Sequence, residues 1–199
     1  MSTHALNFLR ETARIAELID HQEIERIVSG LIAVREQHGR LFVLGVGGGA
    51  ANASHAVNDF RKLCFIDAVS PVDNAPELTA RTNDEGWETV FDSYLRTSRA
   101  CEKDALFIFS VGGGDEEKNI SANIVHAIKE AKCRAMKVYG IVGRDGGYAK
   151  RCGDAVLVVP TVHDGRVTPH TEGFQMVVLH CLVCHPRLSV CEGKWESVR

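Results

Sequence analysis

"LGVGGGAANASHAVNDF", residues 44–60, places a glycine cluster between an apolar run and a segment that carries His55 and Asp59. An apolar run that ends in glycines and leads into a helical pattern is typical of a buried strand turning into a helix. Such a turn presents backbone N–H groups at the start of the helix, where they can bind an anion. The stretch therefore predicts a strand, turn and helix of an α/β fold, in which the turn is either purely structural or the floor of an active site.

The same order of elements recurs along the chain. Five apolar runs read as buried strands of a parallel sheet, because most are too continuous to be one-sided: Leu41–Val46, Phe65–Val69, Leu106–Val111, Val138–Val142 and Ala155–Val159. Helical patterns lie before, between and after them: His4–Ile19, His21–Gln37, Ala50–Lys62, Trp87–Thr97, Ser121–Ala131, Gly147–Arg151 and Pro169–Cys184. This alternation predicts a three-layer α-β-α sandwich around a five-stranded parallel sheet with right-handed crossovers.

The chain shows no linker and no repeat, so we expect its 199 residues to form one domain. Residues 1–38 would form a pair of N-terminal helices, and residues 39–199 the sheet core and the closing helix. The two helices carry more apolar side chains than one small sheet can cover, which predicts a homo-oligomer: Leu6, Phe8, Leu9, Ile15, Leu18 and Ile19.

Composition excludes several classes of function. A formal net charge of −3 gives no basic footprint for nucleic acid. No apolar run approaches the roughly 20 residues that span a bilayer, and the N-terminus has no signal-peptide core. The seven cysteines lack paired spacing, so we expect buried thiols in a reducing compartment. These features favour a cytoplasmic protein without a nucleic-acid or membrane partner.

Ligands of open α/β sheets bind beyond the carboxyl ends of the strands, and three of these ends are rich in glycine. They are Gly45–Gly49, Ser110–Gly114 and Gly143–Gly147. A single such loop could serve only as a tight turn, but three at one edge favour an anionic ligand. The chain has no GxxxxGK[ST] P-loop and no clear ribose-binding acid after the next strand, so a nucleotide is not indicated.

These loops, with Thr82-Asn-Asp-Glu-Gly86, Ser121-Ala-Asn-Ile124 and the segment from Glu172 to His180, resemble the sugar isomerase (SIS) domain family over nearly the whole chain. Within that family they resemble the phosphoheptose isomerases. The resemblance implies a flavodoxin-like sheet and an aldose–ketose isomerase that converts sedoheptulose 7-phosphate to glycero-manno-heptose 7-phosphate. It also implies zinc, and a homotetramer with active sites at subunit interfaces.

The resemblance places a zinc ion, or another divalent cation, on His55, Asp59, Glu172 and His180. The family has Glu where this chain has Asp59, and Gln where it has Glu172. The shorter Asp draws the carboxylate back by about 1 Å, and the Glu adds negative charge. His180 and either Asp59 or Glu172 would then transfer protons through a cis-enediolate.

The residues themselves allow simpler interpretations. His55 and Asp59 lie four apart and share one helix face, which suits a local hydrogen bond as well as a cation. His180 lies in an apolar stretch typical of a core histidine. Glu172 and His180 are eight residues apart, about 12 Å along a straight helix. One cation could bind both if long side chains converged, if the helix were irregular near Gly173, or if the two came from neighbouring subunits.

The resemblance assigns the substrate's phosphate to two of the glycine loops. In the loop that follows the third predicted strand, the hydroxyl-rich pattern of the family is replaced by Ser110-Val-Gly-Gly-Gly114, with six residues inserted before Ser121. Backbone N–H groups would therefore bind more of the anion. Asn83 and Asp84 could bind sugar hydroxyls, or cap the helix around Trp87. The predicted substrate-binding residues are Gly47, Gly48, Gly49, Asn83, Asp84, Ser110, Gly112, Gly113 and Ser121.

Two other functions stay open at this point. One is a non-catalytic SIS module that binds a sugar phosphate as a regulatory signal, which the lost hydroxyls favour. The other is an isomerase of a different sugar phosphate. Two histidines and two acids at the metal positions favour an enzyme, because a sensor needs only the anion site.

Overall fold

A five-stranded parallel sheet lies at the centre of the protein in the computed structural model, which describes residues 3–198. The strand order is β2-β1-β3-β4-β5, the flavodoxin-like order, and it confirms the predicted sheet. The strands are β1 Arg40–Gly45, β2 Asp67–Val69, β3 Ala105–Ser110, β4 Lys137–Val142 and β5 Ala155–Val158.

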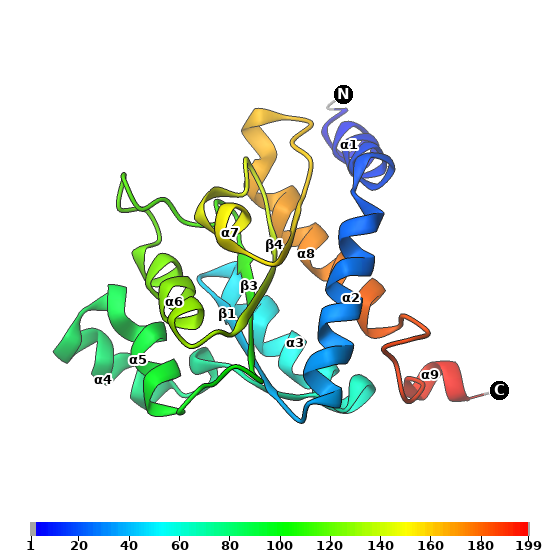
Figure 1. The fold of residues 1–199 in the computed structure, drawn as a ribbon. Coiled ribbons are helices and arrows are strands. Elements are labelled where there is room, and N and C mark those ends of the chain that lie inside the picture. The colour runs from blue at the N-terminus through cyan, green and yellow to red at the C-terminus, as the bar shows by residue number, and fades with distance from the viewer. Residues whose placement is uncertain (1–2, 199) are drawn as a thin grey trace.

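Helices cover both faces of the sheet (Figure 1). One face packs against α2 (His21–Glu36), α3 (Gly48–Cys64) and α8 (Val167–Val183), and the other against α5 (Val90–Thr97), α6 (Ala122–Cys133) and α7 (Gly147–Cys152). Strand side chains alternate between the two cores: Leu41 and Val43 enter the first, Phe42 and Leu44 the second. The predicted three-layer α/β architecture is confirmed. Short 3₁₀ turns span Pro71–Asp73, Trp87–Thr89 and Asp164–Arg166, and α9 spans Lys194–Ser197.

Two elements differ from the sequence prediction. Strand β2 begins at Asp67 because Phe65 ends α3 in a left-handed conformation, with φ at 51° and 69% of the residue exposed. Helix α4 (Ala75–Glu85) lacks the apolar stripe that predicts a helix, since none of its residues is buried. Its turns are joined instead by Arg81, which pairs with Glu77 and Glu85.

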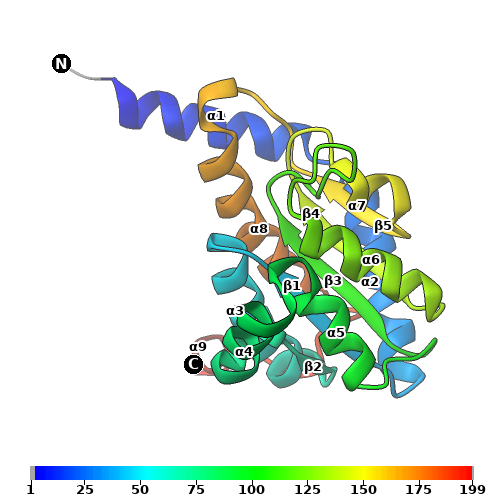
Figure 2. The same cartoon turned by 90° about the vertical axis from the view of Figure 1, so that its left-hand side faces the viewer.

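Helix α1 (His4–Leu18) extends away from the sheet (Figure 2). Ile15 is its buried residue. The Glu11 carboxylate accepts hydrogen bonds from Arg166 at 2.8 Å and pairs with His170 at 2.9 Å, and these two contacts lower the pKa of Glu11 to about 2. Leu6 and Leu9 are 50% and 65% exposed. A role of this helix in subunit packing stays a prediction.

All seven cysteines are free, but the predicted burial of their thiols is wrong for most. Burial holds for Cys64, where it raises the pKa to about 12. Cys133 at the end of α6, Cys181 in α8 and Cys184 just after α8 are exposed.

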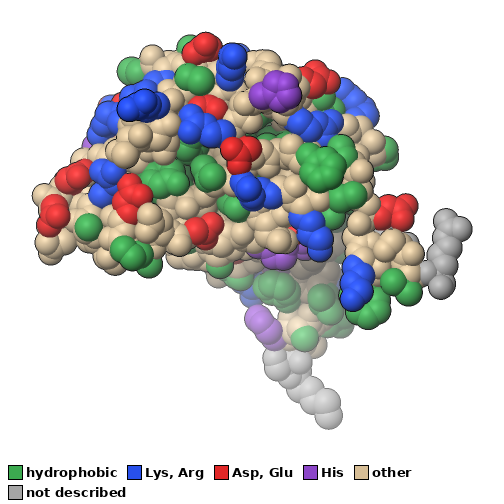
Figure 3. Space-filling model, turned by 90° about the horizontal axis from the view of Figure 1, so that it is seen from below, with side chains coloured by type: hydrophobic (Ala, Val, Ile, Leu, Met, Phe, Trp, Pro, Cys, Tyr) green, Lys and Arg blue, Asp and Glu red, His purple; other side chains and the backbone are tan. Residues whose placement is uncertain are grey.

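Among the described residues, no helix is long and apolar enough to cross a membrane. Acidic and basic side chains are interspersed on the face shown in Figure 3. The cytoplasmic location expected from the sequence stays a prediction.

Candidate active site

The glycine cluster after β1 is required for close packing. A Cβ on Gly45 would overlap the backbone of Gly49, and one on Gly49 would lie 2.6 Å from the carbonyl oxygen of Phe109. Gly47 has φ 59° and ψ −123°, a conformation that side chains disfavour. A Cβ on Gly48 would lie 2.6 Å from the Glu172 carboxylate. The cluster thus brings α3 against the sheet and leaves room for Glu172 at the start of the helix.

Helices α3 and α8 pack against each other on the same face of the sheet, and this contact brings together three of the four predicted cation ligands. The Nε2 atom of His55 lies 3.1 Å from Oδ2 of Asp59 and 3.4 Å from Nε2 of His180. The His180 Nε2 atom lies 3.7 Å from the same Asp59 oxygen. The two imidazoles are exposed, whereas Asp59 is buried.

These distances fit a single cation. A tetrahedral zinc ion with nitrogen and oxygen ligands at about 2.0–2.1 Å separates its ligand atoms by about 3.3–3.4 Å. The three observed separations, 3.1, 3.4 and 3.7 Å, bracket that value. Three protein ligands with a fourth position open to water or substrate is also the pattern of catalytic zinc.

Neighbouring amides hold the two helices and the acid in place. The Asn58 amide donates to Oδ1 of Asp59 at 2.9 Å, which leaves Oδ2 facing the imidazoles. Asn52 donates to the Glu172 carbonyl oxygen at 3.1 Å and to Oε1 of Gln175 at 2.8 Å. The Gln175 amide, fully buried, donates to the carbonyl oxygen of Ile141 in β4. Gln175 therefore connects α3, α8 and the sheet, and sequence analysis did not single it out.

Glu172 lies apart from the three clustered side chains. Its carboxylate rests against the first turn of α3, two turns before His55. Helix α8 runs unbroken through Gly173, so the suggested irregularity there is wrong. Glu172 as a fourth ligand stays a prediction.

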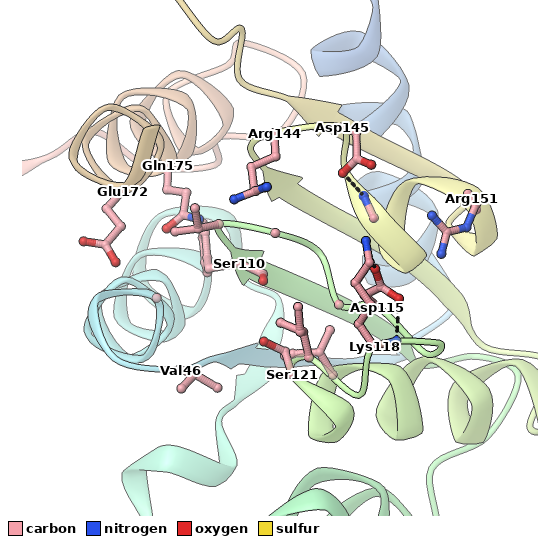
Figure 4. A pocket seen from close by; sticks show the side chains of 18 residues that line it. Val46, Ser110, Asp115, Lys118, Ser121, Arg144, Asp145, Arg151, Glu172 and Gln175 are labelled. Atoms are coloured by element: carbon pink, nitrogen blue, oxygen red, sulfur yellow. Dashed lines mark hydrogen bonds and ion pairs between the residues drawn. The ribbon is translucent and has the colours of Figure 1, made fainter. Parts of the chain in front are cut away.

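A cavity of about 420 Å³ opens at the carboxyl ends of β1, β3 and β4 (Figure 4). Of the predicted residues, Gly49, Ser110, Gly112, Ser121 and Glu172 line it, with Gln175 beside them. Three positively charged side chains that are not among the predicted site residues also line it: Lys118, Arg144 and Arg151. Arg144 follows β4 directly, so its place at the ligand-binding edge was available as a signal.

The glycine loop after β3 (Ser110–Gly114) packs against the one after β4 (Gly143–Gly147). A Cβ on Gly113 would overlap the carbonyl oxygen of Gly146. The N–H groups of Tyr148 and Ala149 donate to the carbonyl oxygens of Gly114 and Gly113 at 2.8 and 2.9 Å. The Gly113 N–H donates to the Ser110 hydroxyl at 3.0 Å, so it is engaged inside the loop. The hydroxyl of Ser121, at the start of α6, makes no capping hydrogen bond.

Asn83 and Asp84 lie on the exposed last turn of α4, where the Asn83 amide donates to Asp84 at 2.7 Å. The capping role considered for them is wrong, because Gly86 precedes the turn at Trp87. They do not line the 420 Å³ cavity, and their binding of sugar hydroxyls stays a prediction. A second cavity of about 440 Å³ adjoins the first at Val46 and Ser121.

Residues 7–143 match the SIS domain family. The chain belongs to this family. It is 30% identical over 192 residues to the phosphoheptose isomerase of Burkholderia pseudomallei (strain K96243), covering 92% of this chain and 91% of that protein.

Two solved phosphoheptose isomerases share the fold. The enzyme of Neisseria gonorrhoeae superposes with a TM-score of 0.77 at 24% identity, covering 90% of this chain and 96% of that one. The enzyme of Francisella tularensis gives 0.79 at 20% identity, covering 92% and 96%. At these identities the likeness to the solved structures shows the fold alone. The family match and the 30% identical relative together identify the protein as a sugar-phosphate isomerase of the SIS family.

Proposed function

We propose that this SIS protein is a divalent-cation-dependent aldose–ketose isomerase that converts sedoheptulose 7-phosphate to glycero-manno-heptose 7-phosphate. The observation that carries the proposal is the group of His55, Asp59 and His180, whose ligand atoms all lie within 4.8 Å of one another. The similar enzyme of Burkholderia pseudomallei is named for phosphoheptose isomerisation. A receptor of sugar phosphates would need the anion cavity but not this group.

The two imidazoles and the Asp59 carboxylate would hold the cation, which supplies a Lewis acid for the sugar carbonyl when bound. Asp59 and His180 would move the protons between the carbonyl carbon and its neighbour. Asp59 is better placed than Glu172, since it lies 3.7 Å from His180 while Glu172 rests at the start of α3. Ser110 and Ser121 would bind the phosphate in the cavity between β3 and α6.

The separation of Glu172 from the three clustered ligands favours a shared site. The exposed imidazoles of His55 and His180 leave the cluster open to a neighbouring molecule. We propose that Glu172 of the partner subunit completes the site in a homotetramer. This assembly would also cover the exposed leucines of α1.

The proposal is tested by incubating the protein with zinc and sedoheptulose 7-phosphate and following the sugar by NMR. An aldoheptose 7-phosphate should form, and chelation should stop its formation. His180→Ala should abolish the conversion with an unchanged circular dichroism spectrum. Binding of the sugar phosphate without conversion by the zinc-loaded protein would contradict the isomerase and support a regulatory binding module.

A further inference from the structure

We infer that Arg144 is the principal charged ligand for the phosphate of the substrate, in place of the hydroxyls that the glycine loop after β3 lacks. The inference rests on the proposed function for the identity of the substrate. It assigns a role to a side chain of the 420 Å³ cavity that is not among the predicted substrate-binding residues.

The loop offers few groups for a phosphate dianion. Val111, Gly112, Gly113 and Gly114 carry no hydroxyl, and the Gly113 N–H is already donated to Ser110. The Ser110 and Ser121 hydroxyls remain, together with the first N–H groups of α6. These groups are neutral, so a dianion would gain from a cation at the same wall.

Three positively charged side chains line the cavity, and two of them have other partners. The Lys118 ammonium pairs with Asp115 at 3.3 Å, within the six-residue insertion. The Arg151 guanidinium lies over the Tyr148 ring at 5.9 Å from its centroid. Among residues 3–198, the Arg144 side chain makes no ion pair or hydrogen bond. Its charge is therefore available to a ligand.

The side chain of Arg144 points into the cavity, between Ser110 and the two residues of α8, Glu172 and Gln175 (Figure 4). Its Cδ lies 3.8 Å from where a Cβ on Gly112 would stand, so the aliphatic part of the side chain runs along the glycine loop at van der Waals distance. A guanidinium in this place can present two parallel N–H groups to phosphate oxygens. Lysine could present only a point charge.

Arg144 determines whether the side chains that line the cavity carry a net negative charge. Three carboxylates line the same cavity as the three cations: Asp115, Asp145 and Glu172. Asp145 accepts the Gly147 N–H at 3.2 Å, and Glu172 sits at the start of α3. Without Arg144 the lining would carry more negative than positive charge and would repel a phosphate. With Arg144 the three cationic side chains equal the three carboxylates in number, and a phosphate gains a cation that has no other partner.

Arg144→Asn removes the charge while keeping the backbone, because Asn tolerates the left-handed conformation that Arg144 adopts at φ 53°. Arg99 provides a matched control. It has φ 52° and lies at the opposite edge of the sheet, before β3. Arg99→Asn therefore reproduces the change of net charge and of turn residue without touching the cavity. Arg144→Lys keeps the positive charge but loses the two parallel N–H groups of the guanidinium.

The test measures thermal stabilisation by inorganic phosphate at constant ionic strength, which needs no turnover. We expect Arg144→Asn to raise the half-saturating phosphate concentration about 10- to 100-fold, as for lost hydrogen bonds to a charged group. Arg144→Lys should lie between this variant and wild type, and Arg99→Asn should match wild type. For sedoheptulose 7-phosphate, KM should rise by a similar factor with little change in kcat.

Equal phosphate responses of Arg144→Asn and Arg99→Asn would overturn the inference, as would the absence of any phosphate response in wild type. The phosphate measurement is independent of the proposed reaction. If phosphate binding depends on Arg144 but sedoheptulose 7-phosphate is not converted, the anion ligand stands and the proposed reaction fails.

Discussion

At the scale of single residues, the proposed cation site begins with a histidine and an aspartate one helical turn apart. The spacing of His55 and Asp59 predicts that they share a face, and the structure places their ligand atoms 3.1 Å apart. The same spacing serves a plain hydrogen bond. The Nε2 atom of His180 lies 3.4 Å from that of His55 and 3.7 Å from the same Asp59 oxygen, and this convergence of three ligand atoms favours a cation.

Asp59→Asn tests the choice of base. We expect kcat/KM for sedoheptulose 7-phosphate to fall about 100-fold or more, because acid–base groups contribute roughly 10²- to 10⁴-fold. Glu172→Gln, which restores the residue expected in the family, should stay within about tenfold of wild type, as for lost binding without lost chemistry. Steady-state kinetics with both zinc-loaded variants would reverse the assignment if Glu172→Gln were the inactive one.

What the sequence could not predict is the set of contacts between segments that lie far apart along the chain. Gly49 faces the carbonyl oxygen of Phe109, and Gln175 connects two helices to β4. Neither contact has a local signature, because the partners lie far away along the chain. Arg144 is different, since its position after β4 already placed it at the ligand-binding edge.

At the scale of elements, the period of the apolar residues was sufficient for the sheet and most helices. Strands β1, β3, β4 and β5 were predicted because they are almost entirely buried and bounded by turn residues, whereas in the edge strand β2 only Ala68 is buried. Helix α4 was missed because its sequence has no buried stripe and its support comes from ion pairs of Arg81. Likewise, the contact of α3 with α8, which assembles the cation group, depends on tertiary packing that no local pattern encodes.

Helix α1 provides a pH-dependent prediction. Hydrogen bonds from Arg166 and His170 lower the pKa of Glu11 to about 2, from 4.5. A lowered carboxyl pKa contributes stability that is fully present above pH 4.5 and is lost as the pH falls through about 2. Glu11→Gln should therefore unfold at a lower temperature than wild type at pH 7.

The difference between Glu11→Gln and wild type should shrink as the pH falls below 4.5 toward 2. Calorimetric scans across that range measure it. A difference that is constant with pH, or that grows on acidification, would show that the Glu11 contacts do not hold α1 to the body.

At the scale of the whole molecule, the exposed face of α1 predicts self-association. Leu6, Leu9 and Leu18 are 50%, 65% and 46% exposed, while α1 buries only Ile15. Light scattering should report a tetramer for wild type. Leu9→Asp should give a smaller species, because it places a charge in the covered surface, whereas Arg10→Asp on the next position should not. A monomeric wild type at micromolar concentration would rule out this assembly.

In the whole molecule, His55, Asp59 and His180 of one chain would together bind one divalent cation. The most direct measurement is the zinc content of protein purified without chelator and equilibrated with zinc, by elemental analysis after removal of unbound metal. We expect about one zinc per wild-type chain and a loss of most of it in His55→Ala, Asp59→Ala and His180→Ala, each folded by circular dichroism. Wild-type protein without zinc, or variants that retain it fully, would contradict the account.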